Sequence, residues 1–275
     1  MKDTVSKFFS EQGIEYFSIL KYSACREINP TLCERYKIAA KTVVIYLLPY
    51  FTVEGENISS YAVGVDYHVV IKRINGELIE LLKEKFPKNE FLSFGDHSPI
   101  DERHAALISG LGILGENGLL INEKYGTYAF IGEIITDLEP SVEDLTPLTA
   151  PRQCSGCGKC KTACPTGILC KEGEACLSAI TQKKGELSDD EITLMIRYNT
   201  AWGCDICQRV CPYNKSPRRT PVMDFYDDLI PHLTRSRLDK MDKGEFSRRA
   251  YAWRGRKTIE RNLCLLENAN KDLQK

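Results

Sequence analysis

No apolar run in this 275-residue chain approaches the length of about 20 residues that a membrane-crossing helix needs. The longest such run, residues 43–50, is short and rich in β-branched side chains, which favours a buried strand. Residues 1–10 carry no signal-peptide pattern. The formal net charge is only −1, so the whole molecule has no strong electrostatic bias. We therefore expect a cytoplasmic protein with no membrane partner.

The usual nucleotide-binding signatures are also missing. No G-x-x-x-x-G-K-[ST] phosphate loop occurs in the chain. Gly110, Gly112 and Gly115 match the spacing of a dinucleotide fingerprint, but they follow a predicted helix, whereas that fingerprint follows a strand. The sequence thus gives no support for a dinucleotide-binding domain.

Cysteine, in contrast, is abundant, and seven of the twelve cysteines fall in two runs. The first run reads C-x2-C-x2-C-x3-C-P and consists of Cys154, Cys157, Cys160, Cys164 and Pro165. The second run consists of Cys204, Cys207, Cys211 and Pro212. This pairing is typical of bacterial two-cluster ferredoxins and predicts two [4Fe–4S] clusters. Two zinc sites would explain the paired C-x2-C motifs, but not the third cysteine or the Cys-Pro of each run.

Two cubane clusters need eight thiolates, one more than the two runs supply. The eighth ligand has to come from one of the remaining cysteines, which are Cys25, Cys33, Cys170, Cys176 and Cys264. Cys170 and Cys176 are nearest in sequence, and we choose Cys176. The first predicted cluster is held by Cys154, Cys157, Cys160 and Cys211. The second is held by Cys164, Cys176, Cys204 and Cys207. Cys25, Cys33 and Cys264 are interpreted as buried free thiols in a reducing compartment.

The periodicity of the chain predicts a mixture of helices and strands. Helices are expected at residues 2–12, 30–40, 59–86, 101–109 and 257–270, with a break near Gly76. Strands are expected at residues 15–20, 42–49 and 128–136. Turn-forming residues at 93–99 predict a loop, and the glycines at 110–115 predict a flexible turn. A polar, proline-marked stretch at 139–152 is the expected boundary. We predict three domains, at residues 1–140, 141–216 and 217–275.

Six stretches of the sequence together resemble one known family. They are residues 61–68 (YAVGVDYH), 96–99 (DHSP), 109–117 (SGLGILGEN), 132–137 (GEIITD), 176–178 (CLS) and 203–214 (GCDICQRVCPYN). This combination resembles the epoxyqueuosine reductase family, cobalamin-dependent iron–sulfur enzymes of queuosine-tRNA synthesis. The resemblance covers roughly residues 40–216.

The resemblance implies an α+β protein in three parts. An N-terminal α/β cobalamin-binding domain precedes a bacterial-type two-cluster ferredoxin domain and a short, basic helical tail. The implied activity removes the epoxide oxygen from epoxyqueuosine in tRNA, with electrons passing through both clusters to cobalamin. The implied partners are tRNA and a reductant such as ferredoxin or flavodoxin, and we expect a monomer.

The resemblance also assigns roles to individual residues. Asp96 opens the D-x-x-P turn and is the expected catalytic proton donor, with a pKa raised by burial against the corrin. The expected cobalamin contacts are Tyr61, Gly64, His68, Asp96 and Ser178. Ile71 stands where a cobalt-ligating Asp-x-His-x-x-Gly signature has glycine. His68 is therefore interpreted as a polar group near the pocket or a core histidine, not as a cobalt ligand.

Some features depart from the family pattern. Glu116 replaces the usual lysine and Tyr213 the usual tryptophan, and the chain resembles a short form that lacks most of the C-terminal helical repeats. Two alternatives therefore remain. One is a cobalamin-dependent reductase of a small molecule, similar to dehalogenases. The other is a non-catalytic two-cluster electron-transfer protein.

A basic segment is the sequence signal for a nucleic-acid partner. Residues 197–261 hold fifteen Lys and Arg but only eight Asp and Glu. Basic pairs such as Arg248-Arg249 lie near Tyr251 and Trp253, which suits phosphate contact together with base stacking. A solvated helical face explains each basic pair alone, whereas together they favour tRNA binding.

Overall fold

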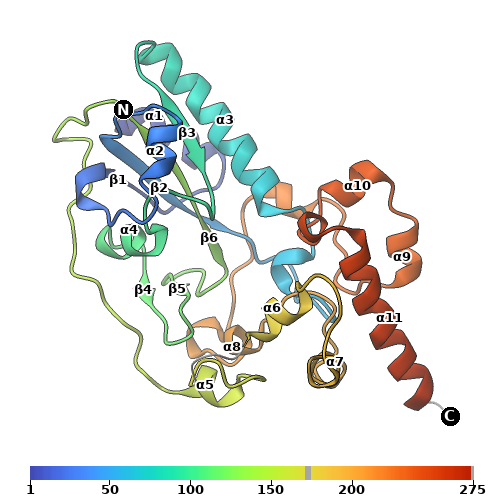
Figure 1. Cartoon of the computed structure of the whole chain (residues 1–275). Helices are drawn as coiled ribbons and strands as arrows, with labels where there is room; N and C mark the ends of the chain where they lie inside the picture. Colours follow the sequence, from blue (N-terminus) through green and yellow to red (C-terminus); the bar gives the residue numbers. More distant parts are fainter. Residues whose placement is uncertain (171–174, 274–275) are drawn as a thin grey trace. The chain divides into compact units, whose positions relative to one another are not determined.

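The computed structural model describes residues 1–170 and 175–273, and these form two compact units (Figure 1). The first unit comprises Met1–Tyr50, His68–Gly156 and Pro217–Val222, and the second comprises Phe51–Tyr67, Cys157–Ser216 and Met223–Lys275. The predicted division at residues 140 and 216 stays a prediction. The last two residues of the predicted tail, 274–275, lie outside the described residues.

The first unit contains a four-stranded antiparallel sheet with the strand order β1-β2-β6-β3. Its strands are β1 (Phe17–Lys21), β2 (Thr42–Pro49), β6 (Ala129–Thr136) and β3 (Phe91–Phe94). A two-stranded sheet pairs β4 (Ile113–Leu114) with β5 (Leu120–Ile121). The helices of this unit are α1 (Lys2–Glu11), α2 (Thr31–Arg35), α3 (Tyr67–Lys85), α4 (Glu102–Ile108) and the 3-10 turn η1 (Tyr22–Ala24).

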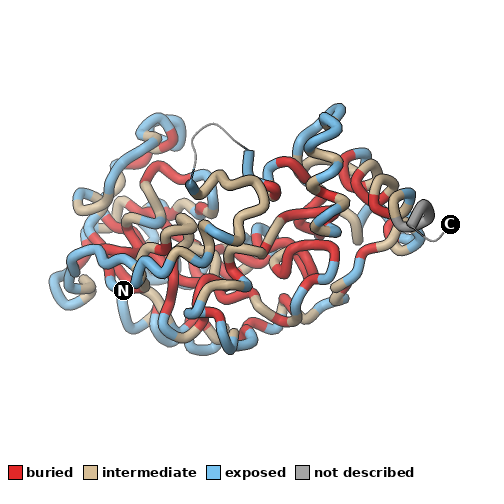
Figure 2. The backbone as a smooth tube through the Cα atoms, turned by 90° about the horizontal axis from the view of Figure 1, so that it is seen from below, coloured by how far each residue is buried: buried red, intermediate tan, exposed pale blue. Residues whose placement is uncertain are grey.

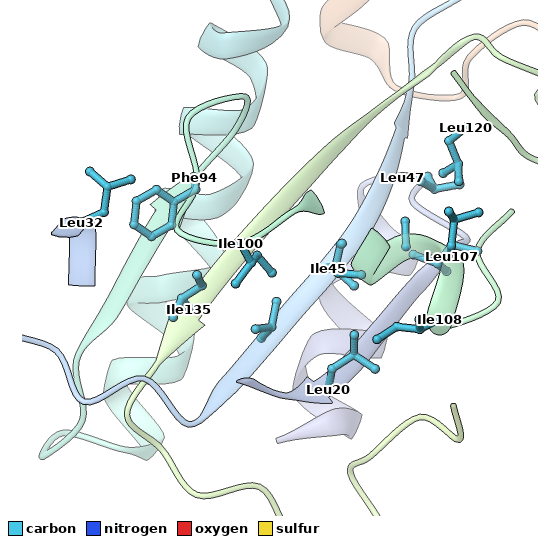
Figure 3. Packing of buried hydrophobic residues seen from close by; sticks show 14 residues of the cluster. Leu20, Leu32, Ile45, Leu47, Phe94, Ile100, Leu107, Ile108, Leu120 and Ile135 are labelled. Atoms are coloured by element: carbon cyan, nitrogen blue, oxygen red, sulfur yellow. The ribbon is translucent and has the colours of Figure 1, made fainter. Parts of the chain in front are cut away.

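Helices cover both faces of the four-stranded sheet because β2 is apolar on both sides. On one face, Val43, Ile45 and Leu47 form a buried cluster with the side chains of α4 (Figure 3). On the other face, Tyr46 packs against Phe9 of α1, with 4.7 Å between ring centroids. Each such large apolar side chain contributes on the order of 2 kcal/mol by burial. The first unit is therefore a mixed α and β fold, as the sequence predicts at the coarse level.

Most of the predicted elements of this unit form close to their expected positions. Asp101 caps α4 by accepting the backbone N–H of His104 at 3.0 Å, which explains why the helix begins at residue 102. Five expectations are wrong in detail. Of the helix expected at 30–40 only Thr31–Arg35 is helical, and the long helix expected at 59–86 begins at Tyr67. Helix α3 runs through Gly76 without a break, the expected loop at 93–99 begins as strand β3, and the expected flexible turn at 110–115 contains β4.

The second unit consists of short helices around one core. They are α5 (Lys159–Ala163), α6 (Leu177–Thr181), α7 (Asp189–Arg197), α8 (Ile206–Arg209), α9 (Arg235–Asp239), α10 (Lys243–Ser247) and α11 (Arg256–Leu273). Its 3-10 turns are η2 (Ser60–Ala62), η3 (Pro212–Asn214), η4 (Met223–Tyr226) and η5 (Ala252–Arg254). Trp202 and Tyr251 are fully buried in this core, with 6.2 Å between their ring centroids.

Helix α11 shows how this unit is held together. Its buried residues Ile259, Leu263 and Leu266 follow helical spacing and join the Trp202 core, so burial alternates with exposure along the helix (Figure 2). Asn262 on the same helix donates to the carbonyl oxygens of Thr181 and Ala201, at 2.7 and 2.8 Å. Within residues 1–170 and 175–273, no helix combines the length and apolarity that crossing a membrane requires.

Candidate active site and cluster-binding segments

Asp96 lies in a tight turn between β3 and α4, and its backbone is left-handed, with φ +68°. Such a conformation is uncommon for a residue other than glycine and has to be held by its surroundings. The backbone N–H of Asp96 donates to Glu102 Oε1 at 3.2 Å. Two residues further on, Ser98 Oγ accepts the backbone N–H of Ile100 at 3.1 Å. The turn is thus held by two hydrogen bonds, whose acceptors Ser98 and Glu102 both follow Asp96 in the sequence.

The structure brings together two of the residues that the sequence singles out. His68, in the first turn of α3, places Nε2 3.6 Å from Oδ2 of Asp96. Both side chains are exposed, 51% for His68 and 59% for Asp96. The alternative of a core histidine is therefore wrong for His68. An imidazole next to an accessible carboxyl group forms a pair that can exchange protons with a ligand.

Two buried carboxyl groups lie behind this pair, on α4 and β6. Burial raises the pKa of Glu102 to about 7, and the negative charge of Asp96 adds to that shift. Glu133 is fully buried, and burial, followed by the charge of Glu102, raises its pKa well above the ordinary value. The Ser98 hydroxyl donates to Oε1 of Glu133. The site therefore contains three interacting carboxyl groups, of which the sequence identified one.

Raised pKa values occur at two carboxyl groups near Asp96, whereas the predicted rise at Asp96 itself depends on burial against the corrin and stays a prediction. The sequence predicts a buried proton donor at Asp96, but the protein itself leaves this side chain largely exposed. The raised pKa values belong to Glu102 and Glu133. A charged residue in the otherwise apolar strand sequence AFIGEIIT was the available signal for Glu133.

Tyr61, Gly64 and Ser178 belong to the second unit, whereas His68 and Asp96 belong to the first. Tyr61 is half-buried in η2. Gly64 is buried, and a Cβ atom there would lie 2.5 Å from the carbonyl oxygen of Phe225, so close packing within the unit already requires glycine. Ser178, in α6, accepts a hydrogen bond from the Gln182 side chain at 3.1 Å.

Helix α5 and helix α8, which carry Cys160 and Cys207, pack against each other in the second unit. Cys204 is near two other predicted ligands of its cluster: burial, together with the charges of Cys176 and Cys164, raises its pKa to about 11. At Cys164, burial is outweighed by backbone and hydroxyl hydrogen bonds to the sulfur, and the net effect lowers the thiol pKa.

These observations fit the chemistry of cluster ligands. Hydrogen bonds that favour the thiolate are expected at a cysteine that binds iron. All twelve cysteines are free thiols. In the described part of the chain, no three His, Cys, Asp or Glu side chains converge as ligands of a single metal ion do. A cubane differs from a single ion because its thiolates bind four separate iron atoms.

A buried carboxylate organises the second cysteine run. Asp205 accepts hydrogen bonds from the Ser59 hydroxyl, from the Ser60 backbone N–H at 2.6 Å and from the Gln208 amide at 3.2 Å. These bonds attach the Cys204–Cys207 turn to the segment preceding Tyr61. Sequence reasoning treated this aspartate only as part of a motif.

Cys25, Cys33 and Cys264, which the sequence predicts to be buried thiols without a role, are only partly buried, and Cys170 is exposed. Burial raises the pKa of Cys25 to about 12, which makes it a poor nucleophile. Cys33 shares a hydrogen bond with the Tyr22 hydroxyl, and Cys264 accepts one from Arg235.

The basic segment is only partly available to a partner. The side chain of Arg249 is 3% exposed and pairs with Asp228, and Tyr251 lies in the core. Neither can contact nucleic acid, so this part of the sequence interpretation is wrong. Trp253, in contrast, is 58% exposed, and the guanidinium of Arg254 lies 3.7 Å from its ring centroid.

Comparison with known proteins first gives the class. Residues 153–214 match the family model described as a 4Fe-4S double cluster binding domain. The chain is thus an iron–sulfur protein with the two-cluster domain that its cysteine spacing predicts.

Curated relatives then give the family. The chain is 35% identical over 222 residues to the epoxyqueuosine reductase of Listeria monocytogenes, covering 76% of this chain and 56% of that protein. It is 32% identical over 251 residues to that of Cyclobacterium marinum, covering 83% of this chain and 77% of that protein. The chain belongs to the epoxyqueuosine reductase family. It spans just over half the length of the Listeria relative.

Solved structures agree with this assignment. The chain is similar to epoxyqueuosine reductase from Bacillus subtilis, with a TM-score of 0.72 and 26% identity, covering 96% of this chain and 80% of that one. That structure has its catalytic aspartate loop swung out of the active site. An epoxyqueuosine reductase with an epoxyqueuosine-modified tRNA stem loop shares the fold, with a TM-score of 0.74, 24% identity and the same coverage.

Proposed function

We propose that this chain reduces epoxyqueuosine to queuosine in tRNA, with electrons passing through two [4Fe–4S] clusters to a bound cobalamin. Family membership and the double-cluster domain support the reaction class. The observation that carries the proposal is the pairing of Asp96, on a strained turn, with His68 of α3, because it provides an accessible acid beside a second proton-exchanging group. The proposed domain limits remain 1–140, 141–216 and 217–275.

The proposed cluster ligands are the two sets predicted from spacing. The first set is Cys154, Cys157, Cys160 and Cys211. The second set is Cys164, Cys176, Cys204 and Cys207. The influence of Cys176 and Cys164 on the pKa of Cys204 supports the second set, since such electrostatic effects require proximity. The proposed external reductant is a ferredoxin or flavodoxin.

The surroundings of Asp96 fit a large, mostly apolar macrocycle. Ile28, 61% exposed, donates its backbone N–H to the carbonyl oxygen of Pro99 in the same turn. Tyr36 is also exposed, and its ring packs edge-on against Phe94, with 6.2 Å between the ring centroids. Large exposed apolar side chains next to a functional turn mark a binding surface. The residues proposed to hold cobalamin are Tyr61, Gly64, His68, Asp96 and Ser178.

Cobalamin, held by the residues proposed above, would supply a strongly reducing cobalt centre. Removing the epoxide oxygen as water and leaving a carbon–carbon double bond takes two electrons and two protons. Asp96 donates a proton to the oxygen as the carbon–oxygen bond opens. His68, 3.6 Å from the Asp96 carboxyl group, orients that group and returns a proton to it.

Contact with tRNA is proposed at Trp253 and Arg254. An exposed tryptophan with a guanidinium over its ring offers a stacking surface and a positive charge together. Lys257, one turn further on, is also exposed and adds charge to the same segment.

The decisive experiment compares wild type with Asp96→Asn in protein loaded with clusters and cobalamin. We expect the variant to retain cobalamin, seen in the visible spectrum, and to lose turnover of epoxyqueuosine-containing tRNA by about 100-fold or more. Asp3→Asn, on α1, is the matched control and should keep full activity. Unchanged turnover in Asp96→Asn would refute its role as the acid.

The same material distinguishes the other reaction classes. Cubane absorbance without bound corrin would favour an electron-transfer protein. Bound corrin with no affinity for tRNA, and turnover of an organohalide instead, would favour a small-molecule reductase.

A further inference from the structure

The second cysteine run carries a buried carboxyl group directly beside one of its proposed ligands. Asp205 follows Cys204 in the sequence, so their Cα atoms are about 3.8 Å apart. Asp205 is only 3% exposed. A charge at such a depth is screened by solvent and salt much less than a charge on the surface, and it acts strongly on its neighbours.

The hydrogen bonds of Asp205 fit an ionised carboxylate. Its Oδ1 accepts the Ser59 hydroxyl and, at 3.2 Å, the Gln208 amide, and its Oδ2 accepts the Ser60 backbone N–H at 2.6 Å. A carboxylate is an acceptor only, and all three partners donate to it. Hydrogen bonds of this kind stabilise the ionised form. Because the three partners are neutral, none of them cancels the negative charge.

Arg209 and Glu56 are the other charged side chains that line the same small cavity as Asp205. Both pair elsewhere: Arg209 Nε lies 2.8 Å from Glu54 Oε1, and Glu56 Oε2 lies 3.1 Å from His232 Nδ1. The cavity has a volume of about 30 Å³, room for one or two water molecules, so little water can collect there. The charge of Asp205 is therefore compensated neither by a cation of this lining nor by bulk solvent.

This charge acts on the sulfur of Cys204. Burial is the main cause of the raised pKa of the Cys204 thiol, and the charges of Cys176 and Asp205 add to it, whereas the backbone N–H of Ile206 acts in the opposite direction. A negative charge that disfavours the thiolate also disfavours adding an electron to the iron that the sulfur binds, because both changes place negative charge in the same region. The reduction potential of a cluster depends on such charges.

We propose that the Asp205 carboxylate lowers the reduction potential of the cluster bound through Cys204. The couple is a one-electron reduction, in which the proposed ferredoxin or flavodoxin supplies the electron and the cluster gains one negative charge. A lower potential makes the reduced cluster a stronger electron donor, and the proposed reaction needs a strongly reducing cobalt centre. This inference rests on the part of the proposed function that assigns Cys204 to a cluster.

The first test measures the potential directly, on full-length protein loaded with both clusters, without tRNA or turnover. The protein is poised at a series of potentials, reduced clusters are quantified by electron paramagnetic resonance, and the signal lost in Cys204→Ala identifies the cluster concerned. In Asp205→Asn we expect its reduced-to-oxidised ratio at a fixed potential to rise about tenfold, a midpoint about 59 mV higher. Asp189→Asn, at an exposed position on α7, is the control and should leave the midpoint unchanged.

The second test separates the charge from the structural role of Asp205. Asparagine has the shape of aspartate, and the Ser59 hydroxyl and the Gln208 amide can each turn to accept a hydrogen bond from it. Ser59→Ala instead keeps the charge and removes one of the hydrogen bonds that attach the Cys204 turn. This variant should lower the melting temperature without raising the midpoint potential.

A gain of charge decides the matter if Asp205→Asn fails to hold its clusters. Asn199 lines the same cavity as Cys204 and Asp205, and its side chain is exposed. Its backbone is left-handed, with φ +45°, a conformation that aspartate adopts nearly as readily as asparagine. Asn199→Asp should therefore fold and should lower the midpoint, by less than tenfold in the ratio because water screens an exposed charge.

An unshifted midpoint in cluster-loaded Asp205→Asn, or an equal rise in Ser59→Ala, would overturn the proposal. Without loaded Asp205→Asn, a midpoint that does not fall in Asn199→Asp would overturn it. The measured potential does not depend on epoxyqueuosine, so the two proposals can fail separately. Shifted midpoints in a chain with no activity on tRNA would refute only the proposed function, and an active chain with unshifted midpoints would refute only the role of Asp205.

Discussion

Gly132 of the GEIITD stretch provides the sharpest structural prediction, because Tyr46 on the paired strand occupies the space of its missing side chain. The two residues are direct partners in the β2–β6 register. A Cβ atom at position 132 would lie 2.5 Å from the Tyr46 hydroxyl oxygen and 2.7 Å from Cε1. Tyr46 is fully buried and donates its hydroxyl to Asn75 Oδ1 at 2.9 Å. The ring therefore has little room to move.

The variant Gly132→Ala should lose about 1–3 kcal/mol of stability, the usual cost of overpacking a core. For a chain of this size that corresponds to a fall in melting temperature of about 2–10 °C, measured by calorimetry or circular dichroism. Gly76→Ala is the matched control, since a Cβ atom on α3 at Gly76 would meet nothing within 4 Å. That variant should be neutral or slightly stabilising. Equal melting temperatures for the two variants would refute the reasoning.

A double-mutant cycle identifies the clash itself. Tyr46→Leu removes the ring tip and its bond to Asn75, so it should destabilise the protein alone. Adding Gly132→Ala to Tyr46→Leu should cost much less than adding it to wild type, because the atoms that clash are gone. Additive costs would show that the space opposite Gly132 is not what requires glycine there.

Three further outcomes are expected. Burial raises the pKa of Glu102 from 4.5 to about 7, so as pH rises Glu102 loses its proton in the unfolded state before it does so in the folded state. The free energy of unfolding should therefore fall by about 3 kcal/mol between these pH values. Denaturation of Glu102→Gln, measured over the same pH range, should not show this fall. Cys176→Ala should lose about half of the bound iron, whereas Cys170→Ala should keep it; the opposite iron contents would reassign the eighth ligand. Replacing Trp253 and Arg254 by alanine should weaken tRNA binding and flatten its salt dependence, and an unaltered salt slope in a binding titration would exclude this segment.

The cluster domain could be predicted from sequence because its chemistry is local. Within each run the ligands are separated by two or three residues, so spacing alone restricts the metal group, and the double-cluster family match confirms that domain. Helix α4 and strands β2 and β6 were predictable for a similar reason, since capping and apolar runs are local signals. Strand β3 was hidden because its four residues precede a turn-rich stretch that dominates the local composition.

The carboxyl group behind the proposed acid could not be predicted in the same way. Glu133 and Glu102 are far apart in sequence, and they interact only because β6 pairs with β3, whose last residue, Phe94, is opposite Glu133. That register places Glu133 next to the turn that carries Asp96 and Ser98. The sequence alone does not show that Glu133 and Glu102 lie close together, whereas the resemblance to a family pointed to Asp96 directly. Predicting this contact would have required knowing that β3 pairs with β6.

The basic segment shows the opposite error, because its composition overestimated the number of residues available to contact nucleic acid. Counting charges gives Arg249 and Arg254 equal weight, and counting aromatic rings does the same for Tyr251 and Trp253. Burial separates them: Arg249 pairs with Asp228 under the surface and Tyr251 packs on Trp202, so both stabilise the second unit. A positive charge contributes to nucleic-acid affinity only where it can displace counterions from phosphate. The surplus of basic residues therefore has to be reduced to its accessible members, and exposed Trp253 with half-buried Arg254 combines a stacking surface with a positive charge.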